Sequence, residues 1–173
     1  MLNNSFIETS RLTLRLMHAT DLDELLRIFT DPRVMASFGG ELFTHEQMQR
    51  WLQRNLDHQA QHGYGLFSVI LTSDRTLIGD CGLEVMDIEG EQVAELGYDF
   101  RSNYWHRGYA TEAAIAVRDY AFQTLGLSRL ISLIRIGNIA SRRVAERVGM
   151  HLDSEFERYG NRYWKFRIDK PST

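Results

Sequence analysis

Two segments of the 173-residue chain carry residue types that could do chemistry, and the first contains Glu95 and Gly108. A strand-like run with Glu95 leads into a polar turn with Gly108, and a helical pattern opens directly after it. The start of a helix offers backbone N–H groups without intrahelical partners and a partial positive charge. Gly108 lets the backbone approach a bulky anion, and Ala110 keeps its own position small. The turn therefore suits a pyrophosphate, although a glycine before a helix can also be a plain turn.

The second segment, residues 138–150, follows a strongly apolar run. Its polar residues Asn138 and Ser141 stand at the start of a predicted helix. Asn138 could be a plain N-cap and Ser141 could satisfy a first-turn amide, or both could present polar groups to a ligand. The segment alone leaves both interpretations open.

Taken together, the two segments resemble the GNAT superfamily of acetyltransferases, and within it the branch of ribosomal-protein N-terminal acetyltransferases. The resemblance covers nearly the whole chain, beginning with residues 8–15, which are similar to that branch's opening strand. Later landmarks are Gly97-Tyr98, the Trp-x-x-Gly-Tyr-Ala-Thr-Glu-Ala run that starts at Trp105, and the Asn-x-x-Ser helix entry. The family's turn usually starts with Gln or Arg. Trp105 replaces it here, as is common in the branch named.

The resemblance implies acetyl-coenzyme A as the cosubstrate, an amine as the acceptor and no metal. The pantetheine arm would lie between the strand ending at Phe100 and the one ending at Ile136, and its sulfur-bearing end would meet Asn138 and Ser141. Tyr98 and Phe100 would border that arm. The pyrophosphate would be held by the turn itself, which consists of His106, Arg107, Gly108, Tyr109, Ala110 and Thr111.

Aminolysis of a thioester requires a neutral amine, a stabilised oxyanion and a protonated thiolate. Glu95 stands where several relatives carry a glutamate base, so we expect it to accept the amine proton, unless it simply faces solvent. By resemblance, a backbone N–H near Tyr98 donates to the thioester carbonyl. Many relatives protonate the thiolate with a tyrosine on the helix after the last core strand. Residues 139–148 contain none, so we expect Ser141, alone or through water, to do so.

The resemblance favours the N-terminal amine of a protein as the acceptor. The alternatives are a small amine, such as a polyamine, an aminoglycoside or an amino acid, and a non-catalytic module that only binds an acyl-coenzyme A. A shallow open groove would favour the protein acceptor, and a closed acidic pocket the small one. Phe38, Phe43 and Trp51 could line an amine site or belong to the core.

The scaffold that must position these residues is predicted as a mixed, mostly antiparallel sheet flanked by helices, an α/β (α+β) class. Thr44 and Gln47 form a capping box, and Gly63 ends the helix that they begin. Thr20 is the expected N-cap of the first helix, Asp31-Pro32 its end, and Gly126 the stop of a later helix. The expected strands are 11–16, 64–71, 77–86, 92–100, 130–136, 151–157 and 162–168, and the expected helices begin near 22, 44, 109 and 141.

Composition limits the remaining possibilities. With 43% hydrophobic residues, residues 1–173 suit a single domain with a real core. The net charge of −3 suggests no attraction to nucleic acid or an anionic membrane. Residues 1–4 do not resemble a signal peptide, so we expect a cytoplasmic protein.

Several features have plain alternatives. Cys81 is the only cysteine and is interpreted as a small strand residue. His58 and His62 stand four apart and could share a metal, but a solvated helix face is expected. The acidic turn at Asp87, Glu89 and Glu91 is expected to be hydrated. The chain could be a monomer or a homodimer, with the aromatic hairpin residues Tyr163, Trp164 and Phe166 facing either a partner or the core.

Overall fold

The computed structural model describes residues 6–88 and 90–172, so residues 1–4 and Glu89, considered above, lie outside the described residues. One eight-stranded sheet has the order β1-β2-β3-β4-β5-β6-β8-β7. All neighbours are antiparallel except β5 and β6, which are parallel. The strands are β1 (Phe6–Glu8), β2 (Leu12–Leu16), β3 (Leu66–Leu71), β4 (Leu77–Ile88), β5 (Glu91–Phe100), β6 (Arg129–Arg135), β7 (His151–Arg158) and β8 (Asn161–Asp169).

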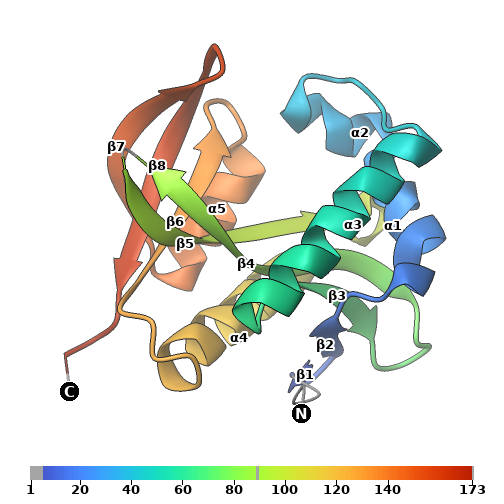
Figure 1. Cartoon of the computed structure of the whole chain (residues 1–173), viewed down its shortest axis with the longest axis horizontal. Coiled ribbons are helices and arrows are strands. Elements are labelled where there is room, and N and C mark those ends of the chain that lie inside the picture. Colours follow the sequence, from blue (N-terminus) through green and yellow to red (C-terminus); the bar gives the residue numbers. More distant parts are fainter. Residues whose placement is uncertain (1–5, 89, 173) are drawn as a thin grey trace.

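Helices cover both faces of this sheet. They are α1 (Leu22–Phe29), α2 (Pro32–Met35), α3 (His45–His62), α4 (Tyr109–Gln123) and α5 (Ile139–Val148), with 3₁₀ helices at Ala19–Asp21, Ala36–Phe38 and Ser102–Tyr104. One core cluster joins α4 and α5 to the sheet, and a second joins α1, α2 and α3 to it. Figure 1 shows α1, α2 and α3 gathered on one side and the β7–β8 hairpin standing opposite them. The predicted fold class is confirmed.

Local signals explain most element boundaries. The Thr44 hydroxyl accepts from the Gln47 N–H at 3.2 Å, and the Gln47 side chain accepts from the Thr44 N–H at 2.7 Å. This is the predicted capping box, and Gly63 ends α3 in the left-handed conformation with φ 75°. No described helix is both long enough and apolar enough to span a membrane.

Some boundaries differ from the prediction. Thr20 lies inside a 3₁₀ helix and Asp21 occupies the N-cap position of α1, because Arg15 and the His18 N–H hold the Asp21 carboxylate. Pro32 begins the short helix α2, since Pro is favoured at the first helical position behind an Asp cap.

Two further helix boundaries and one strand also differ. Helix α4 ends at Gln123, before Gly126. Helix α5 begins at Ile139, directly behind its cap. Strand β1 has three residues, too few to show an alternating pattern. In the C-terminal hairpin, Phe166 is buried in the core, so this aromatic faces inward.

The parallel strands β5 and β6 are paired near Glu95 and diverge toward the C-terminal end of β5. Their pairing register contains Glu95 opposite Ile131, whereas β5 pairs with β4 from Glu91 to Phe100 and β6 pairs with β8 along its full length. Residues 96–100 of β5 therefore have β4 on one side and no paired described strand on the other. An opening between β5 and β6 results, with Glu95 at its apex.

Candidate active site

The glycine-bearing turn lies just beyond the end of β5 and opens α4. Gly108 is the N-cap residue with φ 81°, and His106 also has a positive φ of 60°. The Glu112 N–H bonds to the Gly108 carbonyl at 3.0 Å. The N–H groups of Tyr109, Ala110 and Thr111 precede this first intrahelical bond, so they have no carbonyl acceptor within the helix. The predicted turn thus presents backbone donors at a helix start, where an anion is stabilised.

Arg11 and Glu112 hold this turn against the start of β2. The Arg11 guanidinium donates to the Arg107 carbonyl at 3.0 Å and pairs with Glu112 at 2.6 Å. Glu112 also accepts from the Thr9 hydroxyl at 2.6 Å, and Arg11 lies 4.4 Å over the Tyr109 ring. Both residues lie within the matching motifs, but sequence reasoning assigned neither of them a role.

Tyr98, Asn138 and Ser141 meet across the opening between β5 and β6. The Tyr98 hydroxyl donates to the Ser141 carbonyl at 2.8 Å, and the Ser141 N–H donates to the Asn138 side-chain oxygen at 3.1 Å. Asn138 is therefore the N-cap of α5, the plainer of its two interpretations. Burial raises the pKa of Tyr98, so its hydroxyl stays protonated. The Phe100 side chain is buried in the core, and its carbonyl accepts from the Trp105 indole at 2.8 Å.

Glu95 lies at the apex of this opening. Its carboxylate is partly buried and accepts from the Leu133 N–H of β6 at 3.2 Å. Burial raises the pKa of Glu95 to about 7, partly offset by the Leu133 hydrogen bond. A carboxyl with such a pKa is partly ionised near neutral pH and can accept a proton there. The alternative of a simple solvent-facing carboxylate does not describe this side chain.

Three carboxyl residues that sequence reasoning missed share the sheet face of Glu95. Strand β4 reads Asp-Cys-Gly-Leu-Glu from Asp80 and strand β5 reads Glu-Leu-Gly-Tyr-Asp from Glu95, in mirrored order. The antiparallel register places Asp80 opposite Asp99 and Glu84 opposite Glu95, around a central glycine pair. Alternate strand residues face one side. The mirrored spacing was the signal that could have located these carboxyls.

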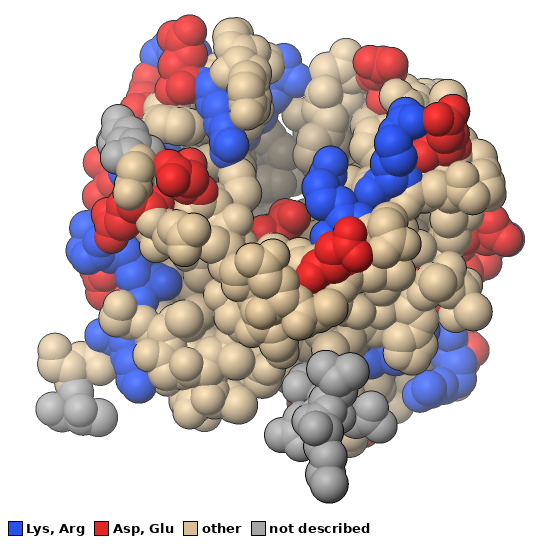
Figure 2. Space-filling model, viewed as in Figure 1, with Lys and Arg blue, Asp and Glu red and all other residues tan. Residues whose placement is uncertain are grey.

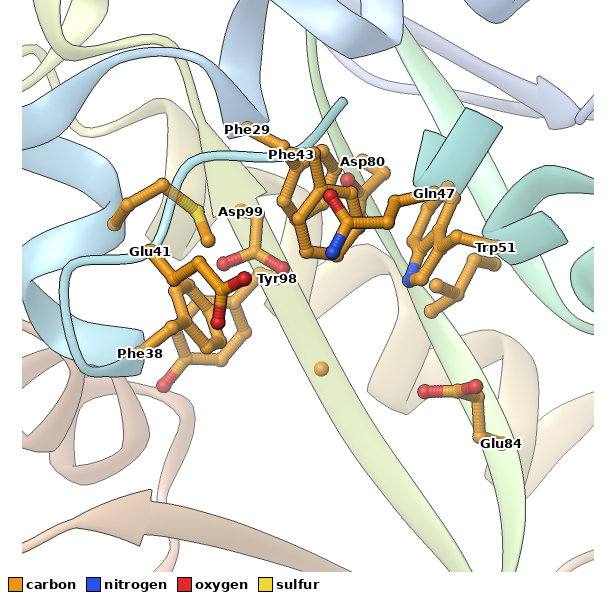
Figure 3. A pocket seen from close by; sticks show the side chains of 13 residues that line it. Phe29, Phe38, Glu41, Phe43, Gln47, Trp51, Asp80, Glu84, Tyr98 and Asp99 are labelled. Atoms are coloured by element: carbon orange, nitrogen blue, oxygen red, sulfur yellow. The ribbon is translucent and has the colours of Figure 1, made fainter. Parts of the chain in front are cut away.

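A pocket of about 310 Å³ lies between this sheet face and the first helices, and Figure 3 shows its side chains. Phe29, Phe43 and Trp51 form an aromatic wall, with the Phe29 ring 5.0 Å from each of the other two. On this side Figure 2 shows a hollow with acidic side chains in and beside it. The full lining is Phe29, Met35, Phe38, Glu41, Phe43, Gln47, Trp51, Leu66, Asp80, Glu84, Gly97, Tyr98 and Asp99.

The carboxyl groups of the pocket are held in an unfavourable environment for negative charge. Asp80 is 0% exposed, and neither of its oxygens has a hydrogen-bond partner among the described residues. Burial, then the charges of Asp99 and Glu84, raise the pKa of Asp80 well above its usual value. Burial and the charge of Glu84 raise the pKa of Asp99 to about 7. This site can therefore hold protons or a cation.

The family is decided by comparison with known proteins. Residues 11–151 match the model of the acetyltransferase (GNAT) domain. The chain belongs to the GNAT family of N-acetyltransferases. An uncharacterised protein of Bacillus subtilis, YkkB, is 37% identical over 154 residues, which cover 87% of this chain and 88% of that protein.

Solved structures agree with this membership. An acetyltransferase from Agrobacterium tumefaciens shares 30% identity with a TM-score of 0.82, over 95% of this chain and 94% of that one. A ribosomal L7/L12 α-N-protein acetyltransferase, solved with coenzyme A, has a TM-score of 0.79 over 95% and 98% of the two chains. At 16% identity the latter shows a shared fold alone.

Two other candidate features of this GNAT protein have structural explanations. The His58 Nε2 accepts from the Val85 N–H at 2.9 Å and so ties α3 to β4, while the His58 and His62 rings lie 4.5 Å apart. Across the described ranges, no three His, Cys, Asp or Glu side chains come together to hold a metal ion. Cys81 is buried in the core, where burial raises the pKa of its thiol.

Proposed function

We propose that this GNAT protein moves the acetyl group of acetyl-coenzyme A directly to a primary amine, with Glu95 as the base. One observation carries the proposal. Glu95 stands at the apex of the opening between β5 and β6, on the sheet face that also carries the pocket's acidic residues. The anion-binding turn lies beyond the far end of β5. Two substrates could therefore approach the opening from different directions.

The residues of the turn and the opening fit acetyl-coenzyme A. The N–H groups at the start of α4, from Gly108 to Thr111, would hold the pyrophosphate, assisted by the exposed His106 and Arg107. The free edge of β5 near Tyr98 would bind the pantetheine arm and donate to the thioester carbonyl. Bound there, acetyl-coenzyme A supplies an acetyl group activated as a thioester.

Glu95 would take the proton that the amine must lose. With a pKa of about 7, a useful fraction of Glu95 is ionised at neutral pH. The new N–C bond forms as the C–S bond of the thioester breaks, and the departing thiolate requires a proton of its own. The Leu133 N–H would orient the Glu95 carboxylate during this exchange.

The thiolate would be protonated at the start of α5. Ser141 stands there, and its carbonyl is bonded to the Tyr98 hydroxyl. We propose the Ser141 hydroxyl as the donor, alone or through water. Tyr98 supports the position of this helix, because its hydroxyl proton is engaged with the Ser141 carbonyl, and burial raises its pKa above the ordinary tyrosine value.

The acceptor has two candidates. The sequence resemblance favours the N-terminal amine of a protein. The geometry favours a small amine, because the pocket is walled by three aromatic rings and contains buried carboxyl groups. An acidic pocket is the feature expected to distinguish a small-amine acceptor from a protein N-terminus.

Titration calorimetry with acetyl-coenzyme A, followed by thiol release on a panel of amines, tests the proposal. The panel contains peptides with N-terminal Ala or Ser, and small mono- and diamines. We expect micromolar binding and thiol release with at least one amine class. Binding without release on any amine would indicate an acyl-coenzyme A binding module, and absence of binding would contradict the proposal.

A further inference from the structure

Asp80 is the most unusual charged residue of the pocket. It is 0% exposed and both of its oxygens lack a hydrogen-bond partner within the described parts of the chain. Burying a carboxyl group in this way costs free energy unless something supplies the missing interaction. Asp80 lines the pocket, so a molecule bound there could supply it.

The pocket has no positive charge of its own to pair with these groups. Its lining contains four carboxyl side chains, from Glu41, Asp80, Glu84 and Asp99, and among the described residues no Lys, Arg or His. The positive charge of Arg54, which does not line the pocket, partly offsets the effect of burial on the pKa of Glu84. Buried charges in proteins are paired or bind ions. The missing partner is therefore a proton or a cation from solution.

The walls indicate an organic cation. The Phe29 ring lies 5.0 Å from the rings of Phe43 and Trp51, and Figure 3 shows these aromatic side chains lining the same pocket as Asp80. Aromatic faces attract ammonium groups and also pack against methylene chains. A volume of about 310 Å³ is at the small end for ligand pockets. A short aliphatic amine matches both the chemistry and the size.

Gly97, the glycine of β5 between the carboxyls, leaves the floor of the pocket without a side chain. A Cβ on Gly97 would meet no atom within 4 Å, so the space above this pocket residue is open. A Cβ on Gly82 would overlap the Gly65 carbonyl oxygen, so packing requires glycine there. Packing does not require it at Gly97, where its absence of a side chain leaves room for a ligand.

We infer that the pocket recognises a small organic cation with two amino groups, of which one reacts near Glu95 and the other is held as an ammonium by Asp80 and Asp99. This inference rests on the proposed function and names its acceptor class. The reacting nitrogen gives its proton to Glu95 as the N–C bond forms and the thioester C–S bond breaks. The second ammonium keeps its protons throughout. The thiolate takes a proton from Ser141 or water, and the proton held by Glu95 replaces it through solvent, so that both side chains return to their starting states.

Matched acceptors test the role of the second amine. Thiol release at saturating acetyl-coenzyme A is measured with 1,5-diaminopentane, 1,4-diaminobutane, 1-aminopentane and 5-amino-1-pentanol. We expect a KM for the better diamine at least tenfold below that for 1-aminopentane. Equal KM values for diamine and monoamine, or release with N-terminal peptides alone, would overturn the inference while leaving the acetyltransferase function intact.

Matched variants test the two carboxyls. Asp80→Asn and Asp99→Asn keep the side-chain shape and should raise the KM for the diamine at least tenfold more than the KM for 1-aminopentane. Asp57→Asn, on the exposed side of α3, removes the same charge outside the pocket and should change neither. Unchanged diamine KM values in both pocket variants would show that these carboxyls do not bind the substrate.

Calorimetry separates this inference from the proposed function. 1,5-Diaminopentane is titrated into wild-type protein and into Asp80→Asn in the presence of coenzyme A. Weaker binding to the variant supports the inference even if every thiol-release assay fails. No binding to the wild type, or equal binding to both, overturns it.

Discussion

The turn before α4 and the pocket over β4 and β5 differ in whether their charged side chains are paired. At the turn, Arg11 and Glu112 satisfy each other and fix the backbone donors that face solvent. In the pocket, Asp80 is buried with no hydrogen-bond partner among residues 6–88 and 90–172, and Asp99 stands opposite it. The charges at the turn are therefore paired within the protein, whereas the described lining of the pocket contains carboxyl groups and no positively charged side chain. We propose that the turn serves the cosubstrate and that the pocket determines the acceptor.

Glu95 stands between the two regions, and its substitution should have the largest effect. Glu95→Gln keeps an acceptor for the Leu133 N–H but removes the base, so kcat should fall about a hundredfold or more. Although the neutral fraction of the amine keeps growing at higher pH, thiol release by the wild type should show an additional step centred near pH 7, because Glu95 must be ionised. The variant should lose this dependence.

Glu91→Gln provides the control for this variant. Glu91 is exposed at the start of the same strand and should tolerate the change with unaltered kcat. Intact turnover in Glu95→Gln would show that another group, such as Asp99, is the base.

The pocket carboxyls of Asp80 and Asp99 should reduce stability. Their pKa values in the folded protein exceed the ordinary ones, so between about pH 4 and pH 7 the folded state binds more protons than the unfolded state. The free energy of unfolding should therefore fall as pH rises through this range. Asp99→Asn should raise it by roughly 1–3 kcal/mol at pH 8 and by little at pH 4. Urea unfolding at the two pH values measures this, and a less stable variant at pH 8 would indicate a structural role.

A substitution in the turn before α4 should have a smaller effect. Gly108 has φ 81°, and a Cβ there costs about 1 kcal/mol or more of backbone strain. Gly108→Ala should therefore distort the donors and weaken acetyl-coenzyme A binding roughly tenfold by calorimetry. Gly160→Ala, with φ 73° in the β7–β8 turn, carries the same strain and should leave binding unchanged. Equal losses in both variants would mean that global strain, not the turn, is responsible.

The smallest effect is expected at Arg11. Its ion pair with Glu112 is partly exposed, so Arg11→Ala should weaken acetyl-coenzyme A binding by only a few fold, about 1 kcal/mol or less. The KM of the amine should not change, since Arg11 lies outside the pocket. A changed amine KM would contradict the separation of the two regions.

The sequence predicted the sheet, the α3 caps and the turn, because each depends on local signals such as Thr44, Gly63 and Gly108. It also placed Asn138 and Ser141 at one helix start. It missed Asp80, Glu84 and Asp99, because a carboxyl in a strand shows neither its burial nor its partner until the register is known. The role of Arg11 depends on a contact with Glu112 a hundred residues away along the chain, which no local pattern indicates.

Crossed calorimetry on two variants tests the division between turn and pocket most directly. Acetyl-coenzyme A and 1,5-diaminopentane are each titrated into Gly108→Ala and Asp80→Asn, with coenzyme A present in the diamine titrations. We predict that Gly108→Ala weakens acetyl-coenzyme A binding alone and that Asp80→Asn weakens diamine binding alone. Asp80→Asn that weakens acetyl-coenzyme A, or that binds the diamine as tightly as the wild type, would contradict it.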